Sequence, residues 1–531
     1  MWWVQQALVW LALGAAFTAA LNYFLMSRNP SPATILLHPK SPSSSALENH
    51  SLHQQVYLRG EVYALRNSVY HKLNQKNRTG ITNAIHTLYD HLPGVKIQYK
   101  TPSPHLPSLI HTLGQDIITR GIITDPWDLA KKWANPRSLV PGSAHGLGDV
   151  LGALATAPIV FADVGYKGSQ LKISLLLKGG QKAVLKPIRY SRDDVIEGVV
   201  YAGLDRHNAE VAAFHLGRLL ALPTVPLTVG RRVSLREHIL PVASRELATT
   251  FFKMEGGEIC FYGVCQYCNK NNSVCDNGAL LESAVMLWLP PHLPLMQLHN
   301  PWKRTYRPTK LAPWEMYPGY CEEVMQHEPY SWDKSPRLLD LMDSAVFDFL
   351  IQNGDRHHYN VIAGKPESAI ILLDNGKRWE MYPGYCEEVM QHEPYSWDKS
   401  PRLLDLMDSA VFDFLIQNGD RHHYNVIAGK PESAIILLDN GKSFGDAEVD
   451  HLDILAPVLQ CCRIRQTTYE RLLLLSGGGL SLAMQELLNL DPLAPVLTRA
   501  HLLALDRRVF HVLAALSACR ERRGSWHHIL F

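Results

Sequence analysis

Apolar residues follow a strand-like pattern in the first half of the chain and a helical pattern in the second. Residues 171–178 read as a strand, Gly179-Gly180 makes a tight turn, and residues 181–185 read as the returning strand. Helical spacing of apolar residues predicts a helix over 208–222. The other predicted elements are a short strand at 284–289, an amphipathic helix at 402–417, a buried strand at 434–438 and mostly helical chain beyond 452. This order predicts an α+β protein of two lobes, strand-rich and then helical, with a cleft between them.

The N-terminus carries a candidate membrane segment. Residues 1–27 contain no charged side chain, and residues 7–26 are nearly all apolar, about the 20 residues that a bilayer-spanning helix needs. A cleaved signal peptide has a shorter apolar core and a basic leader, and no Lys or Arg precedes this run. We therefore expect a signal anchor with a lumenal body; a cleaved signal is the alternative and gives the same compartment. Residues 28–115 are predicted to form a stem, rich in Ser, Pro and His up to about residue 60 and with mixed patterning that allows helix from 61 to about 115.

An internal repeat interrupts the second half. The segment 314–377 recurs without a single change at 379–442, with only Arg378 between the copies. Structural repeats normally diverge, because each copy packs in its own surroundings. Perfect identity therefore indicates a very recent duplication or a gene-model error. We expect one domain with a redundant insert, its first lobe at 116–290 and its second at 291–531.

Charge and cysteines narrow the class of protein. The formal net charge is only +2, so no strong basic field favours a nucleic-acid partner. Nine cysteines are present, and Cys321 and Cys386 are copies of one residue, so a single repeat leaves eight. Cys-x2-Cys at 265–268 is also a zinc pattern. No second ligand pair follows at comparable spacing, and Cys260 and Cys275 flank the pair like an outer bridge, so we favour disulfides over zinc. Glycosylation sequons at Asn77 and Asn271 agree with a lumenal body.

The candidate chemistry lies in two acidic motifs. Asp420-Arg-His-His-Tyr-Asn425 lies between a predicted helix and strand, and Asp439-Asn-Gly441 follows at the end of that strand. A hydroxyl nucleophile needs a carboxylate to orient it and accept its proton, and nucleotide phosphates need a divalent metal held by oxygen ligands. The spacing predicts Asp420 for the first task and Asp439 for the second. The first copy repeats this set as Asp355, Asn360 and Asp374.

A lysine at a strand end completes the set. Lys186 ends the predicted hairpin and could reach phosphate oxygens, with Asp205 or Glu210 at the start of the next helix as its acidic partner. Each feature has an ordinary reading by itself, such as a surface ion pair or a solvated lysine. His422 and His423 could also bind metal, but neighbouring side chains on a strand point to opposite faces. These residues occur together and in the order that a kinase uses them: Lys186, an acid at the start of the next helix, Asp420 and then Asp439. Their joint occurrence favours phosphoryl transfer.

Several motifs together resemble the secretory-pathway kinases called "family with sequence similarity twenty". The resemblance runs from about residue 125 to near Cys519, and its motifs are 205–215, 260–263, 420–424 and 459–462. Segments 166–170, 189–193, 201–203 and 438–445 lean toward the xylosylkinase branch, with the Golgi casein kinase branch next. The resemblance implies a bilobal, atypical protein-kinase-like fold that uses ATP and Mn²⁺ to phosphorylate xylose in the glycosaminoglycan linkage region of proteoglycans. It also implies a single-pass Golgi membrane protein with a lumenal catalytic domain and homo- or heterodimers within the family.

The resemblance also assigns roles to residues. It implies ATP contacts by Gln170 and Lys186, metal ligation by Asp205 and Asp439, catalysis by Asp420, a cofactor contact by Asn425, a structural role for Glu210 and a hinge against adenine at Val285, Met286, Leu287 and Trp288. The implied disulfides are Cys260–Cys275, Cys265–Cys268, Cys462–Cys519 and one from Cys461 to a copied-segment cysteine, taken here as Cys386.

Two departures from the family pattern matter. The family usually has Glu where this chain has Asn425 and Asn360, and the lost charge could weaken ATP binding. This motivates an alternative hypothesis, a pseudokinase that binds and activates a true kinase. The duplication is the second departure, because two copies cannot fill one active site. The second copy runs directly into 443–445 and is predicted to form the site, although the first copy keeps the expected upstream junction at 311–314.

Overall fold

The structure, a computed structural model, describes part of the chain. The described residues are 79–165, 168–199, 202–276, 280–299, 302, 311–317, 319–325, 401–416, 423–427 and 435–531. All of them belong to one unit, residues 59–531. Among the described helices, none is long and apolar enough to cross a bilayer. The predicted anchor at 1–27 lies outside the described residues.

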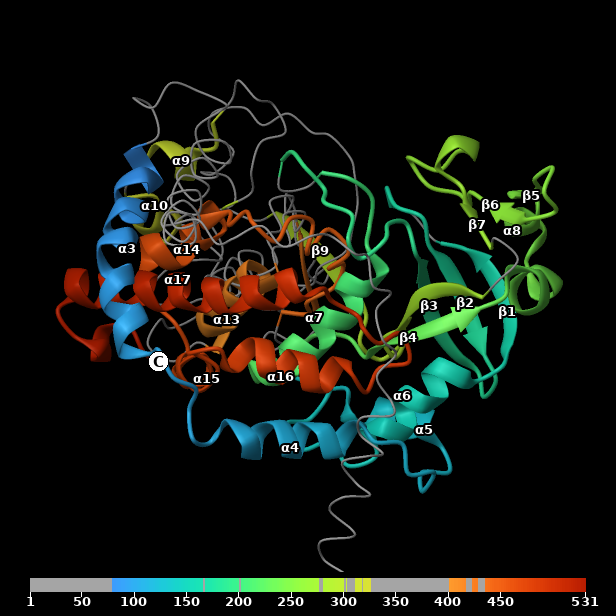
Figure 1. The fold of residues 1–531 in the computed structure, drawn as a ribbon, viewed down its shortest axis with the longest axis horizontal. Coiled ribbons are helices and arrows are strands. Elements are labelled where there is room, and N and C mark those ends of the chain that lie inside the picture. The colour runs from blue at the N-terminus through green and yellow to red at the C-terminus, as the bar shows by residue number, and fades with distance from the viewer. Residues whose placement is uncertain are drawn as a thin grey trace, which may run out of the picture. The chain divides into compact units, whose positions relative to one another are not determined.

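The first lobe is built on a five-stranded antiparallel sheet (Figure 1). Its spatial order is β1-β2-β3-β8-β4, and the strands are β1 (Ile159–Val164), β2 (Ile173–Leu177), β3 (Gln181–Pro187), β8 (Leu281–Leu287) and β4 (Thr228–Val233). The predicted β2–β3 hairpin is confirmed. Its turn places Gly179 and Gly180 at φ of +92° and +82°, a backbone conformation that glycine adopts at little cost. The predicted helix over 208–222 is α7 (His207–Leu219), and almost every residue in it is buried.

A small sheet with two disulfides is appended to this lobe. It has the order β5-β6-β7, with strands Phe251–Lys253, Ile259–Phe261 and Val274–Cys275. Cys260 and Cys275 face each other across β6 and β7 and are bonded. Cys265 and Cys268 are bonded within the loop between these strands. The expected nested bridges are therefore present, and the zinc alternative is wrong for these four cysteines because none is a free thiolate.

The second lobe is helical. Its described helices include α13 (Pro401–Ile416), α14 (Ala456–Cys461), α15 (Gln466–Leu474), α16 (Gly479–Leu488) and the long α17 (Arg499–Arg523). The predicted stem, residues 28–115, extends too far. Helix α3 (Thr79–Gln98) packs against α17, and α4 (Leu106–Ile117) packs against α16. The reason is visible in the spacing of the core residues Ile81, Ile85, Leu88, Leu92 and Val95, which gives α3 one apolar face.

The remaining described elements are short. They are α5 (Pro126–Trp133), α6 (Leu147–Thr156), η3 (Leu235–Ile239), η4 (Leu240–Val242), α8 (Arg245–Ala248), η5 (Lys270–Asn272), β9 (Leu295–His299), α9 (Pro313–Met316), α10 (Tyr320–Met325), β10 (His423–Ile427), η7 (Leu452–Leu455) and η8 (Trp526–His528). β10 pairs antiparallel with β9. The predicted strand at 434–438 is buried from Ile435 to Leu438 but forms no strand; the Leu437 N–H donates instead to the Thr224 carbonyl at 3.0 Å.

A buried ion-pair cluster fastens α17 to the loop before η7. Asp450 accepts from Arg507 Nε at 2.5 Å and from Arg508 Nε at 2.8 Å. The side chain of Arg508 is fully buried, and its guanidinium also donates to the carbonyl of Leu415. Burial by itself would raise the pKa of Asp450, but the two arginines outweigh burial and hold this pKa well below its ordinary value. Asp450 therefore stays ionised and stabilises the fold at neutral pH.

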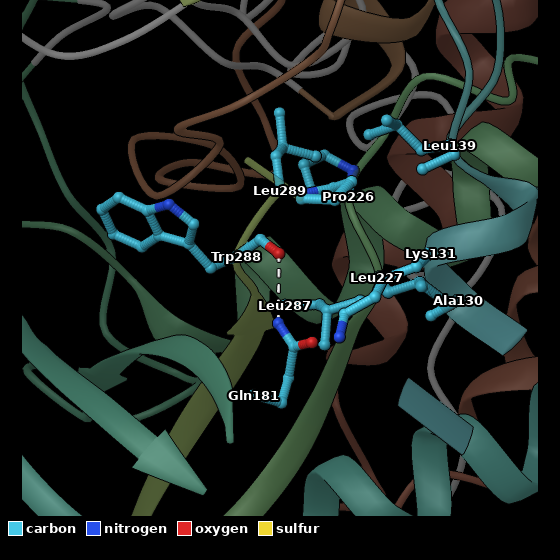
Figure 2. A pocket seen from close by; sticks show the side chains of 11 residues that line it. Ala130, Lys131, Leu139, Gln181, Pro226, Leu227, Leu287, Trp288 and Leu289 are labelled. Carbon is cyan, nitrogen blue, oxygen red and sulfur yellow. Dashed lines mark hydrogen bonds between the residues drawn. The ribbon is translucent and has the colours of Figure 1, made fainter. Parts of the chain in front are cut away.

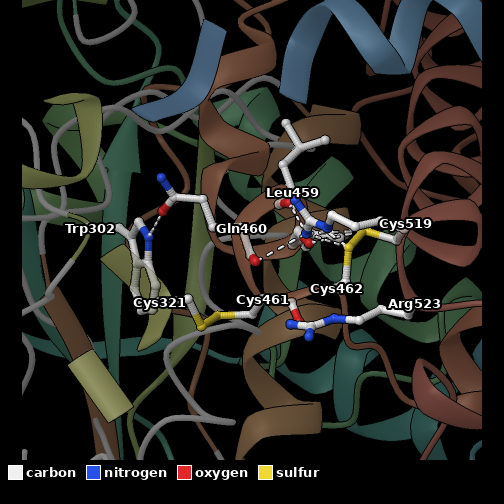
Figure 3. Close-up of a disulfide and its surroundings, with 10 residues drawn as sticks. Trp302, Cys321, Leu459, Gln460, Cys461, Cys462, Cys519 and Arg523 are labelled. Atoms are coloured by element: carbon white, nitrogen blue, oxygen red, sulfur yellow. Dashed lines mark hydrogen bonds between the residues drawn. A yellow bond between two sulfur atoms is a disulfide. The ribbon is translucent and has the colours of Figure 1, made fainter. Parts of the chain in front are cut away.

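The two copies of the repeat contribute to different elements of this one lobe. The first copy supplies Trp314 and α10, and the second supplies α13, β10 and Ile435–Lys442. Cys461 is bonded to Cys321 of the first copy (Figure 3), so the expected Cys386–Cys461 pair is wrong. The other expected pair, Cys462–Cys519, is present. Chain continuity explains the division: the segment before Trp314 runs into the first copy, and the segment after Lys442 leaves the second.

The junction around Cys321 is well packed. The indole N–H of Trp302 donates to Gln460 Oε1 at 2.8 Å, and Gln460 Nε2 donates to the carbonyl of Trp314 at 3.0 Å. Cys321 and Trp314 are both buried. These contacts hold the start of the first copy against α14. Cys386, the copied equivalent of Cys321, lies outside the described residues.

Candidate active site

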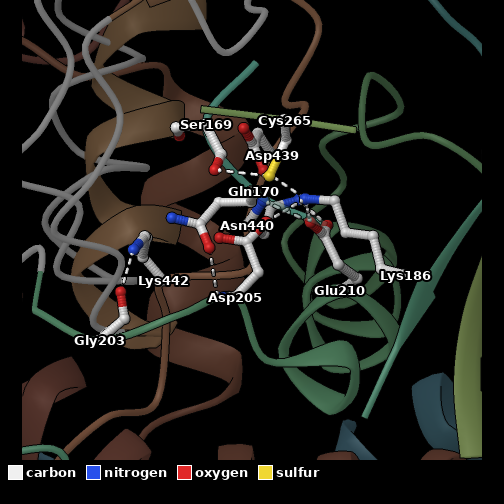
Figure 4. A network of polar contacts seen from close by, with 10 residues as sticks. All are labelled: Ser169, Gln170, Lys186, Gly203, Asp205, Glu210, Cys265, Asp439, Asn440 and Lys442. Carbon is white, nitrogen blue, oxygen red and sulfur yellow. Dashed lines mark hydrogen bonds and ion pairs between the residues drawn. The ribbon is translucent and has the colours of Figure 1, made fainter. Parts of the chain in front are cut away.

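Lys186 lies at the centre of a buried acidic cluster at the end of β3 (Figure 4). Its Nζ is 2.8 Å from Asp205 Oδ2 and 2.6 Å from Glu210 Oε1, and it also contacts Asp439 Oδ1. The sequence offered Asp205 or Glu210 as its partner. The structure brings both together with Asp439, across more than 250 residues of sequence.

The charges of the cluster do not cancel. Burial favours neutral Lys186, but Asp205, Asp439 and Glu210 outweigh it and raise the pKa of Lys186 well above its ordinary value. Burial raises the pKa of Glu210, while the neighbouring ammonium of Lys186 acts in the opposite direction. With all groups ionised, three carboxylates and one ammonium leave two negative charges. Such a site attracts a divalent cation or a cation-bound phosphate.

Oxygen ligands in the cluster fit such a cation. Carboxylate oxygens of Asp205, Glu210 and Asp439 all lie within 4.8 Å of one another. An all-oxygen set suits hard divalent ions such as Mg²⁺ and Mn²⁺. Asp205 and Asp439 were the predicted metal ligands. Glu210 was assigned a structural role from the resemblance, and the structure places its carboxylate in the same cluster. Its position in the first turn of α7, five residues after Asp205, was the available signal.

Backbone contacts lock the segment after Asp439 to the start of α7. The Arg206 N–H donates to the Gly441 carbonyl at 2.7 Å, and its guanidinium donates to the carbonyls of Lys442 and Ser443. Glu210 accepts from the Asn440 N–H at 3.0 Å. The distance between Asp205 and Asp439 is therefore set by a hydrogen-bonded frame and not by their side chains alone.

Gly441 is required by a close approach inside this frame. A Cβ added at Gly441 would lie 2.6 Å from Asp205 Cγ. In the structure its direct neighbour is Asp205. Asp439 itself has φ of +57°, a left-handed conformation that Asp tolerates better than most residues.

Gln170 links the loop after β1 to the cluster. Its side chain is buried, and its Oε1 accepts from the backbone N–H of Asp205 at 3.3 Å. Gln170 thus lies beside the carboxylates, and its contact with ATP remains a prediction.

The predicted hinge lies on β8 and just after it. Met286 faces Val184 of β3 in the sheet register. The Trp288 N–H donates to the Lys182 carbonyl at 3.0 Å, and the Trp288 carbonyl accepts from Gln181 Nε2 at 3.2 Å. A small cavity lined by Leu227, Leu287 and residues of α5 lies beside this strand end, and the indole of Trp288 points away from it (Figure 2). A contact of the hinge with adenine remains a prediction.

Other predicted residues lie outside the described part of the chain. These are Asp420, His422 and the first-copy residues Asp355, Asn360 and Asp374. Asn425 and His423 belong to β10, whose backbone pairs with β9, and their side chains are not described. The role of Asp420 as the group that acts on the acceptor hydroxyl therefore remains a prediction.

Comparisons with known proteins agree on one family. The family described as "Golgi casein kinase, C-terminal, Fam20" matches residues 125–378 and again 377–528. The glycosaminoglycan xylosylkinase of Danio rerio is 44% identical over 76% of this chain and 82% of its own length. The human glycosaminoglycan xylosylkinase is 42% identical over 79% of this chain and 83% of its own length.

Solved structures of the same family share the fold. The structure of hydra Fam20 with sugar matches with a TM-score of 0.62 and 38% identity, covering 77% of this chain and 99% of that one. The crystal structure of the Golgi casein kinase with Mn/ADP bound matches with a TM-score of 0.61 and 25% identity, covering 83% of this chain and 92% of that one.

Proposed function

Because this chain belongs to the Fam20 kinase family, we propose that it transfers the γ-phosphate of ATP to a xylose hydroxyl in the glycosaminoglycan–protein linkage region of proteoglycans. The observation that carries the phosphoryl-transfer part is the buried cluster of Lys186 with Asp205, Glu210 and Asp439. The sugar acceptor is supported by the 42% and 44% identity to two glycosaminoglycan xylosylkinases over most of both chains. The cofactors are ATP and Mn²⁺, as in the related Golgi casein kinase structure with Mn/ADP.

The residues of the cluster divide the work of binding the nucleotide. Lys186 stays protonated because three carboxylates surround it, and its ammonium is placed to bind phosphate oxygens. Asp205 and Asp439 would hold Mn²⁺, which would neutralise charge on the phosphates. Glu210, itself held by Asn440, fixes the position of the Lys186 ammonium. Gln170 contributes a further nucleotide contact from the loop after β1.

Asp420 completes the proposal from the acceptor side. Its carboxylate would orient the xylose hydroxyl and accept its proton, because it precedes Asn425 and Asp439 in the sequence at kinase-like spacing. Asn425, where the family usually has Glu, removes one negative charge from the nucleotide side. Reduced ATP affinity is therefore expected, and Asn425→Glu should improve it.

The cellular setting follows from the same resemblance. Four disulfides in the described part of the chain suit an oxidising compartment. We propose that residues 1–27 anchor the protein in the Golgi membrane, with residues 28–531 in the lumen. Pairing with a second family member is part of this proposal.

A labelling assay tests the acceptor. Protein with ATP and Mn²⁺ should phosphorylate a galactosyl-xylose acceptor. Labelling of acidic secreted proteins without labelling of the sugar would move the function to the casein kinase branch. Nucleotide-dependent thermal stabilisation without any phosphate transfer would instead favour the pseudokinase alternative.

Two substitutions test the assigned carboxylates. Asp439→Ala should lower metal-dependent nucleotide affinity and turnover together, because it removes a metal ligand. Asp420→Asn should keep nucleotide affinity and abolish turnover, because it keeps the shape but removes the proton acceptor. The copied residues provide matched controls: Asp374→Ala and Asp355→Asn should leave both quantities unchanged. Loss of activity from the first-copy changes alone would mean that the first copy forms the catalytic loop.

A further inference from the structure

We propose that the disulfide loop at residues 263–269, called here the CxxC loop, is a clamp that positions Gln170 for nucleotide binding. This inference rests on the proposed nucleotide contact of Gln170. The CxxC loop lies between β6 and β7 of the small sheet, outside the kinase-like core sheet. It nevertheless reaches across to the loop after β1, residues 168–172, which carries Gln170.

Backbone hydrogen bonds join the two loops. The Gln266 N–H donates to the Gly168 carbonyl at 3.2 Å, and the Tyr267 N–H donates to the Ser169 carbonyl at 3.3 Å. The sulfur of Cys265 lies 3.1 Å from the same Ser169 carbonyl oxygen (Figure 4). The two residues that immediately precede Gln170 are thus held by the three residues 265–267.

A packing contact continues the clamp on the other side of Gln170. Gly263 has φ of +61°, and a Cβ added there would lie 2.5 Å from Leu171 Cδ1. Leu171 is buried. The CxxC loop therefore contacts the chain both before and after Gln170, whose own Oε1 accepts from the Asp205 N–H. A path of direct contacts runs from the disulfide to a proposed metal ligand.

The two disulfides of the small sheet have different surroundings. Cys260 is fully buried beside Phe261, whereas Cys265 and Cys268 are half-buried and the residues between them are exposed. The outer bond therefore supports the sheet, and the inner bond closes a short loop whose backbone donors face the segment 168–169. Opening the inner ring frees Gln266 and Tyr267 to leave those carbonyls, since a short cross-linked loop has far fewer conformations than an open one.

The double variant Cys265→Ser/Cys268→Ser tests the clamp through nucleotide affinity. We expect the Kd for ADP with Mn²⁺ and the KM for ATP to rise about tenfold, the effect of losing two hydrogen bonds of ordinary strength, with kcat within about twofold of wild type. Peptide mapping should show the Cys260–Cys275 bond intact. Unchanged nucleotide affinity in a variant that has lost only the inner disulfide would overturn the proposal, as would a fall in apparent kcat with Kd and KM unchanged, which is what a general loss of folded protein produces.

Two further measurements separate positioning from simple stabilisation. Gln266→Pro, which removes the N–H that donates to Gly168 but keeps both cysteines, should weaken nucleotide binding, whereas Gln266→Ala, which keeps the N–H, should not. In a Gln170→Ala background, opening the disulfide should change the Kd by less than about twofold, because its effect passes through Gln170. Full additivity would contradict the clamp. Because ADP binding needs no acceptor, these results stand even where xylose phosphorylation fails.

Discussion

Replacing Lys186 by Met gives the sharpest test of the acidic cluster. The change removes the ammonium and keeps a side chain of similar length, so the carboxylates of Asp205, Glu210 and Asp439 remain within 4.8 Å of one another with no cation of the protein between them. Breaking a buried ion pair by removing one partner costs about 3 to 5 kcal/mol. The free energy of unfolding of the metal-free protein should fall by that amount.

The same reasoning predicts that Mn²⁺ without nucleotide will restore much of the stability that the variant has lost. In the wild type, the Lys186 ammonium lies between the carboxylates and competes with a cation for them. Without it, the cluster has three negative charges and no competitor. Mn²⁺ at about 100 times its Kd would return about 2.7 kcal/mol, while phosphate transfer stays lost because the phosphate-binding ammonium is gone.

Thermal unfolding with and without Mn²⁺ measures both effects. A loss of this size corresponds to a fall in Tm of roughly 3 to 5 °C for a chain this long. Lys182→Met is the matched control, because Lys182 is an exposed lysine on the same strand β3 and should leave Tm and metal response unchanged. An unaltered Tm in Lys186→Met, or equal stabilisation of variant and wild type by Mn²⁺, would refute this account of the cluster.

Three other substitutions probe the frame around the site. Gly441→Ala should lower kcat/KM at least tenfold, since the added Cβ would lie 2.6 Å from Asp205 Cγ. Wild-type kinetics in this variant would show that the backbone around Gly441 can move without disturbing the site. Cys321→Ser should destabilise the second lobe and Cys386→Ser should not, as judged by thermal unfolding and disulfide mapping, and equal effects would contradict the observed Cys321 pairing. Asp450 has a pKa below its unfolded value, so the stability it contributes is fully present above about pH 4 and is lost as the pH falls below that. In Asp450→Asn, the free energy of unfolding should therefore fall less steeply on acidification than in the wild type. Equal pH dependence in the two proteins would show that this carboxylate is not the cause of the acid sensitivity.

The duplication has a simple consequence for experiments. Because residues 314–377 and 379–442 are identical, removing one repeat unit together with Arg378 yields the same shortened chain wherever the cut is placed. The shortened chain keeps one copy of each residue that the two repeats supply to the described elements. Point substitutions, and not deletions, are therefore the way to ask which copy supplies a given side chain.

Local patterns were sufficient to predict much of this protein. The β2–β3 hairpin was predictable because Gly179-Gly180 separates two apolar runs, and α7 was predictable from its helical spacing. The nested bridges of the small sheet were indicated by the order of four nearby cysteines. Lys186, Asp205 and Asp439 could be named as site residues because kinase chemistry requires these residue types in this order along the chain.

Tertiary structure alone decided which distant groups meet. The sequence left Asp205 and Glu210 as alternatives for Lys186, and packing of α7 against β8 and β4, in the sheet that contains β3, brings both within ion-pair distance. No local signal showed that Gly441 makes room for Asp205, or that the CxxC loop holds the residues before Gln170, since both contacts join segments far apart in the chain. Nor could identical copies reveal whether Cys321 or Cys386 bonds to Cys461. Two identical sequences have identical local preferences, so only their connections to the rest of the folded chain can distinguish them.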